Sequence, residues 1–240
     1  MAGKVVVDGG VVTKPGTLIK ASARISLRGT PLRFASRGGY KLDHALNRFG
    51  IILTGKVCLD AGASTGGFTD CMLQRGARRV HAVEAGYGQL RGRLAADPRV
   101  VSMERTNISD LRADQLAAGI EFAAVDLSYL SLVAAVPVVA RLFHGRSVEM
   151  VCLVKPLYEG LAQHHLNDRP ALAGVLHRLL AGLQASGLPA VDACVSPILG
   201  GRGAIEFLAH IRDRCITPGA DALTDRMMRE LDAHPPRELP

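Results

Sequence analysis

Three charged residues follow or interrupt apolar runs in the second half of the chain. Asp126 follows EFAAV, Lys155 follows EMVCLV, and Glu206 lies within GAIEFLAHI, which we predict to be a strand. Because α/β proteins build their sites at the carboxyl ends of strands, we expect these side chains to converge. A buried charge without a partner is unfavourable, so we expect Lys155 to pair with both carboxylates, and Lys41 can join them.

Such a cluster can take a proton from a hydroxyl group. A ribose hydroxyl is a weak nucleophile because it keeps its proton at neutral pH. A desolvated lysine beside a second ammonium group can accept that proton, while two carboxylates orient the lysine. For each residue taken singly, the alternative is an ordinary structural ion pair.

A glycine-rich turn stands between the strand and the helix that we expect around residues 56–75. It reads Asp60-Ala61-Gly62-Ala63-Ser64-Thr65-Gly66-Gly67-Phe68. Glycines let the backbone curl tightly and approach a ligand closely. Glu84 ends the next expected strand, 22 residues after Gly62. A carboxylate at that place can accept hydrogen bonds from both ribose hydroxyls of an adenosine.

Two nucleotide cofactors compete for this turn. NAD sites carry GxGxxG, whereas this turn reads GxxxGG and lacks the middle glycine that lets a helix N-terminus meet a pyrophosphate. Asp60 would repel a phosphate but attract the ammonium group of a methionine moiety. The turn therefore favours S-adenosylmethionine over NAD, and the remaining alternative is a glycine turn that only packs.

The order of apolar runs predicts the fold class. We predict strands at residues 56–60, 79–84, 99–103, 121–126, 149–155, 190–196 and 204–212. Helical spacing predicts helices at residues 40–49, 68–75, 130–143 and 170–186. Short apolar strands that alternate with helices indicate an α/β fold of the Rossmann-like type. We expect a mostly parallel seven-stranded sheet with helices on both faces, and a final antiparallel strand pair that turns at Gly200-Gly201.

Excess positive charge is concentrated near the N-terminus. The net charge is +7, and residues 1–45 hold eight basic and two acidic residues. This distribution is typical of a polyanion-binding appendage on a neutral catalytic body, although a solvated face is the alternative. The candidate RNA contacts are Lys4, Lys14, Lys20, Arg33 and Arg37. With 4% aromatic residues and no tryptophan, base stacking on an aromatic platform is not expected to dominate.

Several kinds of site are not expected. The five cysteines are scattered and lack CxxC spacing, so we expect buried reduced thiols. We predict no metal site, since the adjacent His164 and His165 come without further ligands at metal spacing. Neither a signal peptide nor a membrane-spanning apolar run is present, so we predict a cytoplasmic protein without membrane contact.

The same motifs resemble a known family. The chain resembles the TlyA (hemolysin A-like) branch of the FtsJ-type ribose 2′-O-methyltransferases over nearly all of residues 1–212. The stretches that carry the resemblance are SRGGYKLDHAL (37–47), CLDAGASTGGFTDCMLQRGA (58–77), VEAGYGQL (83–90), DPRVVSMERTNISDL (97–111), VDLSYLSL (125–132), LVKP (153–156) and IEF (205–207).

This resemblance implies a site and a substrate. It implies a Lys-Asp-Lys-Glu tetrad, S-adenosylmethionine contacts around residues 64–68, and ribosomal RNA or a ribosomal subunit as partner. The implied tetrad residues are Lys41, Asp126, Lys155 and Glu206, and the implied cofactor contacts include Glu84, Asn107 and Asp126. Nothing in the chain reads as a pore-forming segment, which the hemolysin label would require.

The resemblance also implies a domain organisation. Residues 1–30 resemble the strand half of an S4 RNA-binding module, residues 31–39 form a linker, and residues 40–215 form the FtsJ-like domain. Residues 216–240 are expected to be a tail with a frayed, proline-rich end. A complete S4 module carries a helical pair before VVVDGG, so we expect either an upstream start or weaker RNA docking.

Three functions stay open at this point. The leading hypothesis is an RNA 2′-O-methyltransferase. Residues 157–170 depart from the family's Gly- and basic-rich loop, so a small-molecule methyltransferase with a closed pocket there is the second hypothesis. A non-catalytic RNA-binding protein that keeps the fold is the third.

Overall fold

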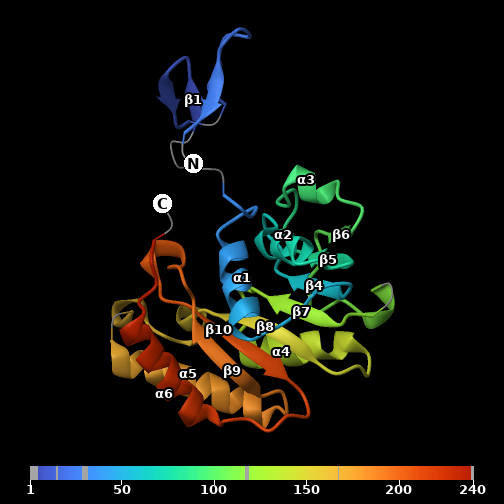
Figure 1. The fold of residues 1–240 in the computed structure, drawn as a ribbon, viewed down its shortest axis with the longest axis vertical. Helices are drawn as coiled ribbons and strands as arrows, with labels where there is room; N and C mark the ends of the chain where they lie inside the picture. Colours follow the sequence, from blue (N-terminus) through green and yellow to red (C-terminus); the bar gives the residue numbers. More distant parts are fainter. Residues whose placement is uncertain (1–4, 15, 29–31, 117–118, 167, 239–240) are drawn as a thin grey trace. The chain divides into compact units, whose positions relative to one another are not determined.

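The computed structural model describes residues 5–14, 16–28, 32–116, 119–166 and 168–238. The chain folds as two compact units, Met1–Arg33 and Phe34–Pro240 (Figure 1).

The small unit is a three-stranded antiparallel sheet in the order β2-β1-β3, formed by β1 (Val5–Val7), β2 (Gly10–Val12) and β3 (Ile25–Leu27). Asp8 and Gly9 form the hairpin between β1 and β2, with φ of 49° and 85°. An Asp-Gly pair suits such a two-residue turn because both positions need positive φ. The strands that the resemblance implies for residues 1–30 are present, and the assignment to an S4 module stays a prediction.

The large unit is built on a seven-stranded sheet in the order β6-β5-β4-β7-β8-β10-β9. The strands are β4 (Val57–Ala61), β5 (Arg79–Val83), β6 (Val100–Met103), β7 (Phe122–Val125), β8 (Glu149–Val154), β9 (Ala190–Val195) and β10 (Phe207–Arg212). All neighbouring strands pair in parallel except β10, which runs antiparallel to both β8 and β9. The predicted fold class is therefore confirmed.

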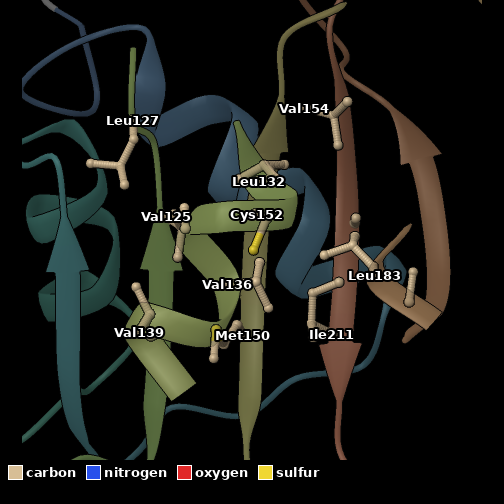
Figure 2. Close-up of a cluster of buried hydrophobic side chains, with 14 of the residues drawn as sticks. Val125, Leu127, Leu132, Val136, Val139, Met150, Cys152, Val154, Leu183 and Ile211 are labelled. Carbon is tan, nitrogen blue, oxygen red and sulfur yellow. The ribbon is translucent and has the colours of Figure 1, made fainter. Parts of the chain in front are cut away.

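Helices cover both faces of this sheet. They are α1 (Gly38–Arg48), α2 (Gly67–Gln74), α3 (Gly92–Ala95), α4 (Leu132–Ala140), α5 (Arg169–Ala185) and α6 (Ala220–Ala233). Alternate side chains of β8 enter different cores, because successive residues of a strand point to opposite faces. Val151 and Leu153 pack with α1 and α2, whereas Met150 and Cys152 pack with α4 and α5. Figure 2 shows the second core, with Val136 of α4 beside Cys152 and Met150.

The structure differs from the predicted linker at residues 31–39. Phe34 and Ala35 are buried, and the Ala35 N–H donates to the Asp70 carboxylate at 2.7 Å. Gly39 leaves room for this packing, because a Cβ there would lie 2.3 Å from the Phe34 Cβ. The glycine pair that looked like a flexible connection is thus the start of α1 packed against an aromatic ring.

The structure also differs after residue 216, where we expected a tail and assigned no helix. Helix α6 buries Leu223, Met227 and Leu231, and it packs against α5 and β9. These three residues are spaced four apart, so the helical signal was present in the sequence. Glu206 is a smaller correction, since it lies one residue before β10 rather than inside that strand.

Candidate active site

The glycine turn lies between β4 and α2, at the carboxyl end of the sheet. Gly62 has φ of 93°, and a Cβ there would lie 2.3 Å from the backbone oxygen of Asp126. The N–H groups of Gly62 and Ala63 both donate to the Val83 carbonyl at 3.0 Å. A side chain at position 62 would therefore push apart the ends of β4 and β7, so only glycine fits.

Glu84 follows β5 and accepts hydrogen bonds from two loops, the glycine turn and the loop after β5. One carboxylate oxygen accepts the Ser64 N–H at 2.9 Å, and the other accepts the Gly86 N–H at 2.7 Å. Each oxygen keeps a further lone pair for a ligand. Glu84 thus holds the glycine turn next to the loop after β5 and can still accept hydroxyl hydrogen bonds.

A first cavity of about 330 Å³ opens between these loops. Five of the predicted site residues line it: Gly62, Ser64, Glu84, Asp126 and Lys155. Its volume lies within the range of pockets that bury small ligands.

Other lining residues of the first cavity were missed from the sequence; they include Gln89, Thr106, Leu127, Ser128 and Tyr129. Three of them directly follow Asp126 in the chain. Their place after a strand that ends in a site residue was a usable signal. Gln89 lies in the stretch 83–90, whose only signal was its share in the family resemblance.

The remaining residues of the glycine turn shape it without lining the first cavity. Ala63 and Phe68 are buried, and Thr65 is half-buried. Gly66 and Gly67 permit close packing, since a Cβ would lie 2.3 Å from Leu94 Cδ1 at the first and 2.2 Å from Ser36 Oγ at the second. These five predicted contacts therefore belong to the turn and the start of α2 but do not line the first cavity.

Asn107 is exposed beside the first cavity, and its neighbours Thr106 and Ile108 line that cavity. Its side-chain oxygen accepts the Ser109 N–H at 2.9 Å and the Tyr129 hydroxyl at 3.5 Å. The side chain thus holds the loop after β6 beside the tyrosine ring, and the structure does not place it on the cavity wall.

Asp60 is completely buried under the glycine turn and does not line the first cavity. One carboxylate oxygen accepts the Thr69 hydroxyl at 2.6 Å, while the other has no hydrogen-bond partner among the described residues. Burial raises the pKa of Asp60 to about 7, with smaller contributions from the charges of Asp126 and Glu84, and the Thr69 hydrogen bond opposes this rise. A cation bound in the first cavity would stabilise the ionised carboxylate.

The four predicted catalytic residues form two ion pairs, and the expected pairing of Lys155 with Glu206 is not among the ion pairs of the described residues. Lys155, directly after β8, pairs with Asp126, directly after β7, and its ammonium lies 3.1 Å from the Ser128 hydroxyl oxygen. Lys41 of α1 pairs with Glu206, and both side chains are buried. The two pairs draw together residues that are far apart in the sequence.

A second cavity of about 340 Å³ adjoins these pairs. It is lined by Lys155, Pro156, Leu157, Tyr158, Gly201, Arg202, Ala204, Ile205 and Glu206. Among the residues that the structure describes, Lys155 alone lines both cavities. An amine at this junction can act on a group in the second cavity while a ligand occupies the first.

The predicted RNA contacts are placed less specifically. Lys14, Lys20 and Arg33 are exposed in the small unit, and Arg37 is exposed just before α1 in the large unit. Lys4 lies outside the described residues. Their exposure is compatible with contact to a polyanion, and no nucleic acid contact is assigned by this observation alone.

Two further features bear on the chemistry. In the described part of the chain, no three His, Cys, Asp or Glu side chains are grouped to hold a metal ion. His165 instead contacts the Asp168 carboxylate at 3.0 Å. Within the described ranges, no helix combines the length and apolar character needed to cross a bilayer.

The first cavity fits an S-adenosylmethionine better than a phosphate-bearing cofactor. Glu84 offers acceptors for ribose hydroxyls, while Asp60 and Asp126 place negative charge where a positively charged amino acid moiety would be stabilised. One carboxylate oxygen of Asp60 has no hydrogen-bond partner among the described residues. A cationic ligand bound on the other side of the glycine turn would stabilise the ionised form of this carboxylate.

Comparisons with known proteins agree with this geometry. The sequence pattern of the FtsJ-like methyltransferases matches residues 34–212. The chain is 36% identical to the 16S/23S rRNA (cytidine-2′-O)-methyltransferase TlyA of Mycobacterium tuberculosis, over 98% of this chain and 90% of that protein. It is 40% identical to YqxC, a candidate rRNA methyltransferase of Bacillus subtilis, over 88% of this chain and 77% of that protein.

A solved structure is similar as well. A candidate hemolysin from Streptococcus thermophilus superposes with a TM-score of 0.75 and 34% identity, covering 97% of this chain and 89% of that chain.

Proposed function

The chain belongs to the FtsJ-like methyltransferases, and from this premise we propose that it methylates a ribose 2′-hydroxyl of ribosomal RNA. It is an enzyme that depends on S-adenosylmethionine, as the family does. The choice of ribosomal RNA is supported by the relatives in Mycobacterium tuberculosis and Bacillus subtilis, whose names carry that substrate. We further propose that the protein acts in the cytoplasm, where ribosomal RNA is assembled into subunits.

The observation that carries this proposal is the position of Lys155 at the junction of the two cavities. The first cavity has the acceptors and negative charges that suit the cofactor. The second cavity has room for the acceptor nucleoside beside Tyr158 and Glu206. Asp126 lines the first cavity and Glu206 lines the second, and Lys155 lines both.

This arrangement supports a direct transfer. The bound cofactor supplies an electrophilic methyl group on a sulfonium. In the proposed transfer, the ribose hydroxyl would lose its proton to the Lys155 side chain as its oxygen takes the methyl group, and the cofactor would leave as a neutral thioether. Asp126 and Ser128 orient the amine, and the Lys41–Glu206 pair places a second ammonium and a carboxylate beside the second cavity. Alignment of the reacting atoms supplies much of the acceleration.

We assign RNA docking to the small unit, which we propose to be a partial S4-like module spanning residues 1–30. Its exposed Lys14 and Lys20 can neutralise phosphates, and such contacts make binding depend steeply on salt. The large unit carries the chemistry.

A transfer experiment tests the function. Purified protein is incubated with methyl-labelled S-adenosylmethionine and, in parallel, with ribosomal subunits, protein-free ribosomal RNA and a small-molecule extract. We expect label in ribosomal RNA, released as a 2′-O-methylated nucleoside after digestion. Label only in the small-molecule fraction, or no label at all, would overturn the proposal.

A small-molecule acceptor is the second candidate, favoured by one observation. The segment that departs from the family pattern supplies Leu157 and Tyr158 to the wall of the second cavity. A small neutral acceptor would bind with little dependence on salt, whereas RNA binding weakens steeply with salt. The salt dependence of KM for the acceptor therefore separates the two candidates.

A further inference from the structure

The end of the chain pairs with the loop that follows β9. Ile198 and Arg237 form a parallel β-bridge. The Leu199 N–H donates to the Arg237 carbonyl, and the Arg237 N–H donates to the Pro197 carbonyl, both at 3.1 Å. We call residues 234–237 the C-terminal strap. It follows α6 directly and lies beyond residues 34–212, the part matched by the family pattern.

The strap pairs with one end of a loop, and the other end of that loop carries the site residue Glu206. This loop, residues 196–206, is closed on itself. The Ser196 N–H donates to the Glu206 carbonyl at 2.9 Å, and the Ser196 hydroxyl donates to the Ile198 carbonyl at 2.7 Å. The Gly200 N–H donates to the Ala204 carbonyl at 2.8 Å. A shift of the segment 197–199 would therefore be passed on to Gly200 and Glu206.

Gly200 touches the Glu206 carboxylate directly. A Cβ at Gly200 would lie 2.2 Å from Glu206 Oε1 and 2.4 Å from its Cδ. The φ of Gly200 is −73°, which any residue adopts, so the glycine is needed for space rather than for backbone conformation. Glu206 is thereby confined between Gly200 and the Lys41 ammonium.

We propose that the C-terminal strap is a positioning element of the active site. By pairing with residues 197–199 it fixes Gly200 against the Glu206 carboxylate, and it thereby holds the Glu206–Lys41 pair at the second cavity. The catalytic consequence rests on the proposed function, whereas the mechanical link between strap and loop does not. The opposing view is that α6 and the strap only add stability to the large unit.

A matched pair of variants separates these views. Arg237→Pro removes the N–H that donates to Pro197, because proline has no backbone donor. Arg237→Ala keeps that N–H and removes only the side chain. We expect kcat for ribosomal RNA to fall about 3- to 10-fold in Arg237→Pro, the scale of one lost hydrogen bond. We expect Arg237→Ala to stay near the wild type, and the cofactor Kd to be unchanged in both.

A second substitution tests the contact with Glu206 itself. Gly200→Ala places a methyl group where the carboxylate lies, so it should displace Glu206 from Lys41. We expect a lower kcat with an altered pH profile of kcat and an unchanged cofactor Kd. Gly92→Ala in α3 is the control, because a Cβ there would meet nothing within 4 Å. A normal kcat and pH profile in Gly200→Ala would overturn the proposed contact.

Hydrogen exchange keeps the test independent of the reaction. In Arg237→Pro we expect faster exchange at the Leu199 and Gly200 amides and no change in the glycine turn at residues 62–67. Unchanged exchange at residues 197–206 would overturn the strap. A fall in kcat that is matched by an equal fall in cofactor affinity and stability would also overturn it. A wild-type protein that transfers no label to RNA would instead overturn the proposed function.

Discussion

The cofactor half of the site, formed by residues 60–67 and Glu84, is joined by contacts such as Ser64 to Glu84, 20 residues apart. The acceptor half, formed by Lys41, Lys155, Glu206 and the second cavity, depends on Lys41 meeting Glu206, 165 residues apart. Both halves lie at the carboxyl edge of one sheet. The first is set by a single strand–turn–helix unit and the next strand, whereas the second needs α1, β8 and the loop before β10 together.

This contrast separates the two tasks of a methyltransferase. A local turn can hold a cofactor of constant shape, because the geometry of the turn is specified by its own glycines. An acceptor site assembled from distant elements can change through one loop without disturbing that turn. From the resemblance we expect the acceptor half to depart from its family at residues 157–170 and the cofactor half to keep the family pattern.

The largest effect should come from Lys155, where the halves meet. Lys155→Ala should lower methyl transfer about 10²- to 10⁴-fold, the contribution typical of a positioned general base. Cofactor affinity, measured by calorimetry, should change little. Lys56→Ala is the control, because Lys56 is also a paired lysine, bound to Glu149 at 2.8 Å, but lies before β4. Equal transfer by Lys155→Ala and wild type would contradict the assigned role.

Asp60 tests the cofactor half through pH. Burial holds the pKa of Asp60 at about 7, compared with 3.8 for an unburied carboxyl, so the folded protein binds a proton that the unfolded chain has lost between these values. The stability of the wild type should therefore fall as pH rises from 4 to 7 and level off above 7.

Asp60→Asn removes this titration and keeps an acceptor for Thr69. The variant should gain stability relative to the wild type by on the order of 4 kcal/mol across that window. Urea unfolding of both proteins without cofactor, at several pH values, measures the difference. Parallel stability curves would show that Asp60 does not titrate there.

Gly62 tests whether the turn needs glycine for space as well as for conformation. Gly62→Ala would force a Cβ against the Asp126 carbonyl at a positive φ. Gly55→Ala has the same conformational strain, with φ of 76°, but meets nothing within 4 Å. We expect Gly62→Ala to be less stable than Gly55→Ala by about 1–3 kcal/mol. Cofactor affinity should fall only in Gly62→Ala, and equal behaviour of both variants would argue against close approach.

The smallest effect should come from the small unit. Replacing Lys14 and Lys20 by alanine should weaken RNA binding at low salt and reduce the slope of log affinity against log salt by about one per lost phosphate contact. Cofactor binding should not change. Arg212→Ala, an exposed substitution in the large unit, is the control. A slope equal to that of the wild type would remove these lysines from the RNA interface.

Much of the fold was predictable because each strand of the large unit is a short apolar run in the sequence. Every predicted strand of the large unit has a counterpart within one to three residues, and the family resemblance is confirmed by the match over residues 34–212. Phe34 was assigned to the linker although its partner Gly39 lies five residues away in the same segment, and α6 was assigned to the tail although Leu223, Met227 and Leu231 recur at helical spacing.

Some residues of the candidate site could be predicted from the sequence, and others could not. Asp126 and Lys155 were found from their places after apolar strands, and they form an ion pair. Lys41 came from the resemblance and from the need to pair buried charge, and its partner is Glu206. Tyr158 lies in the segment for which the second hypothesis expects a pocket, although it was not singled out, and Arg202 came without any such signal.

The sequence by itself determined the α/β architecture, the glycine turn and the acid that follows the second strand of the large sheet. These features depend on hydrophobic periodicity and on residues close together in the chain. Only the tertiary structure decided that Lys155 stands between two cavities, and that the end of the chain pairs with the loop leading to Glu206. Such contacts form between backbone groups and cavity walls brought together by packing, and one-dimensional spacing does not specify them.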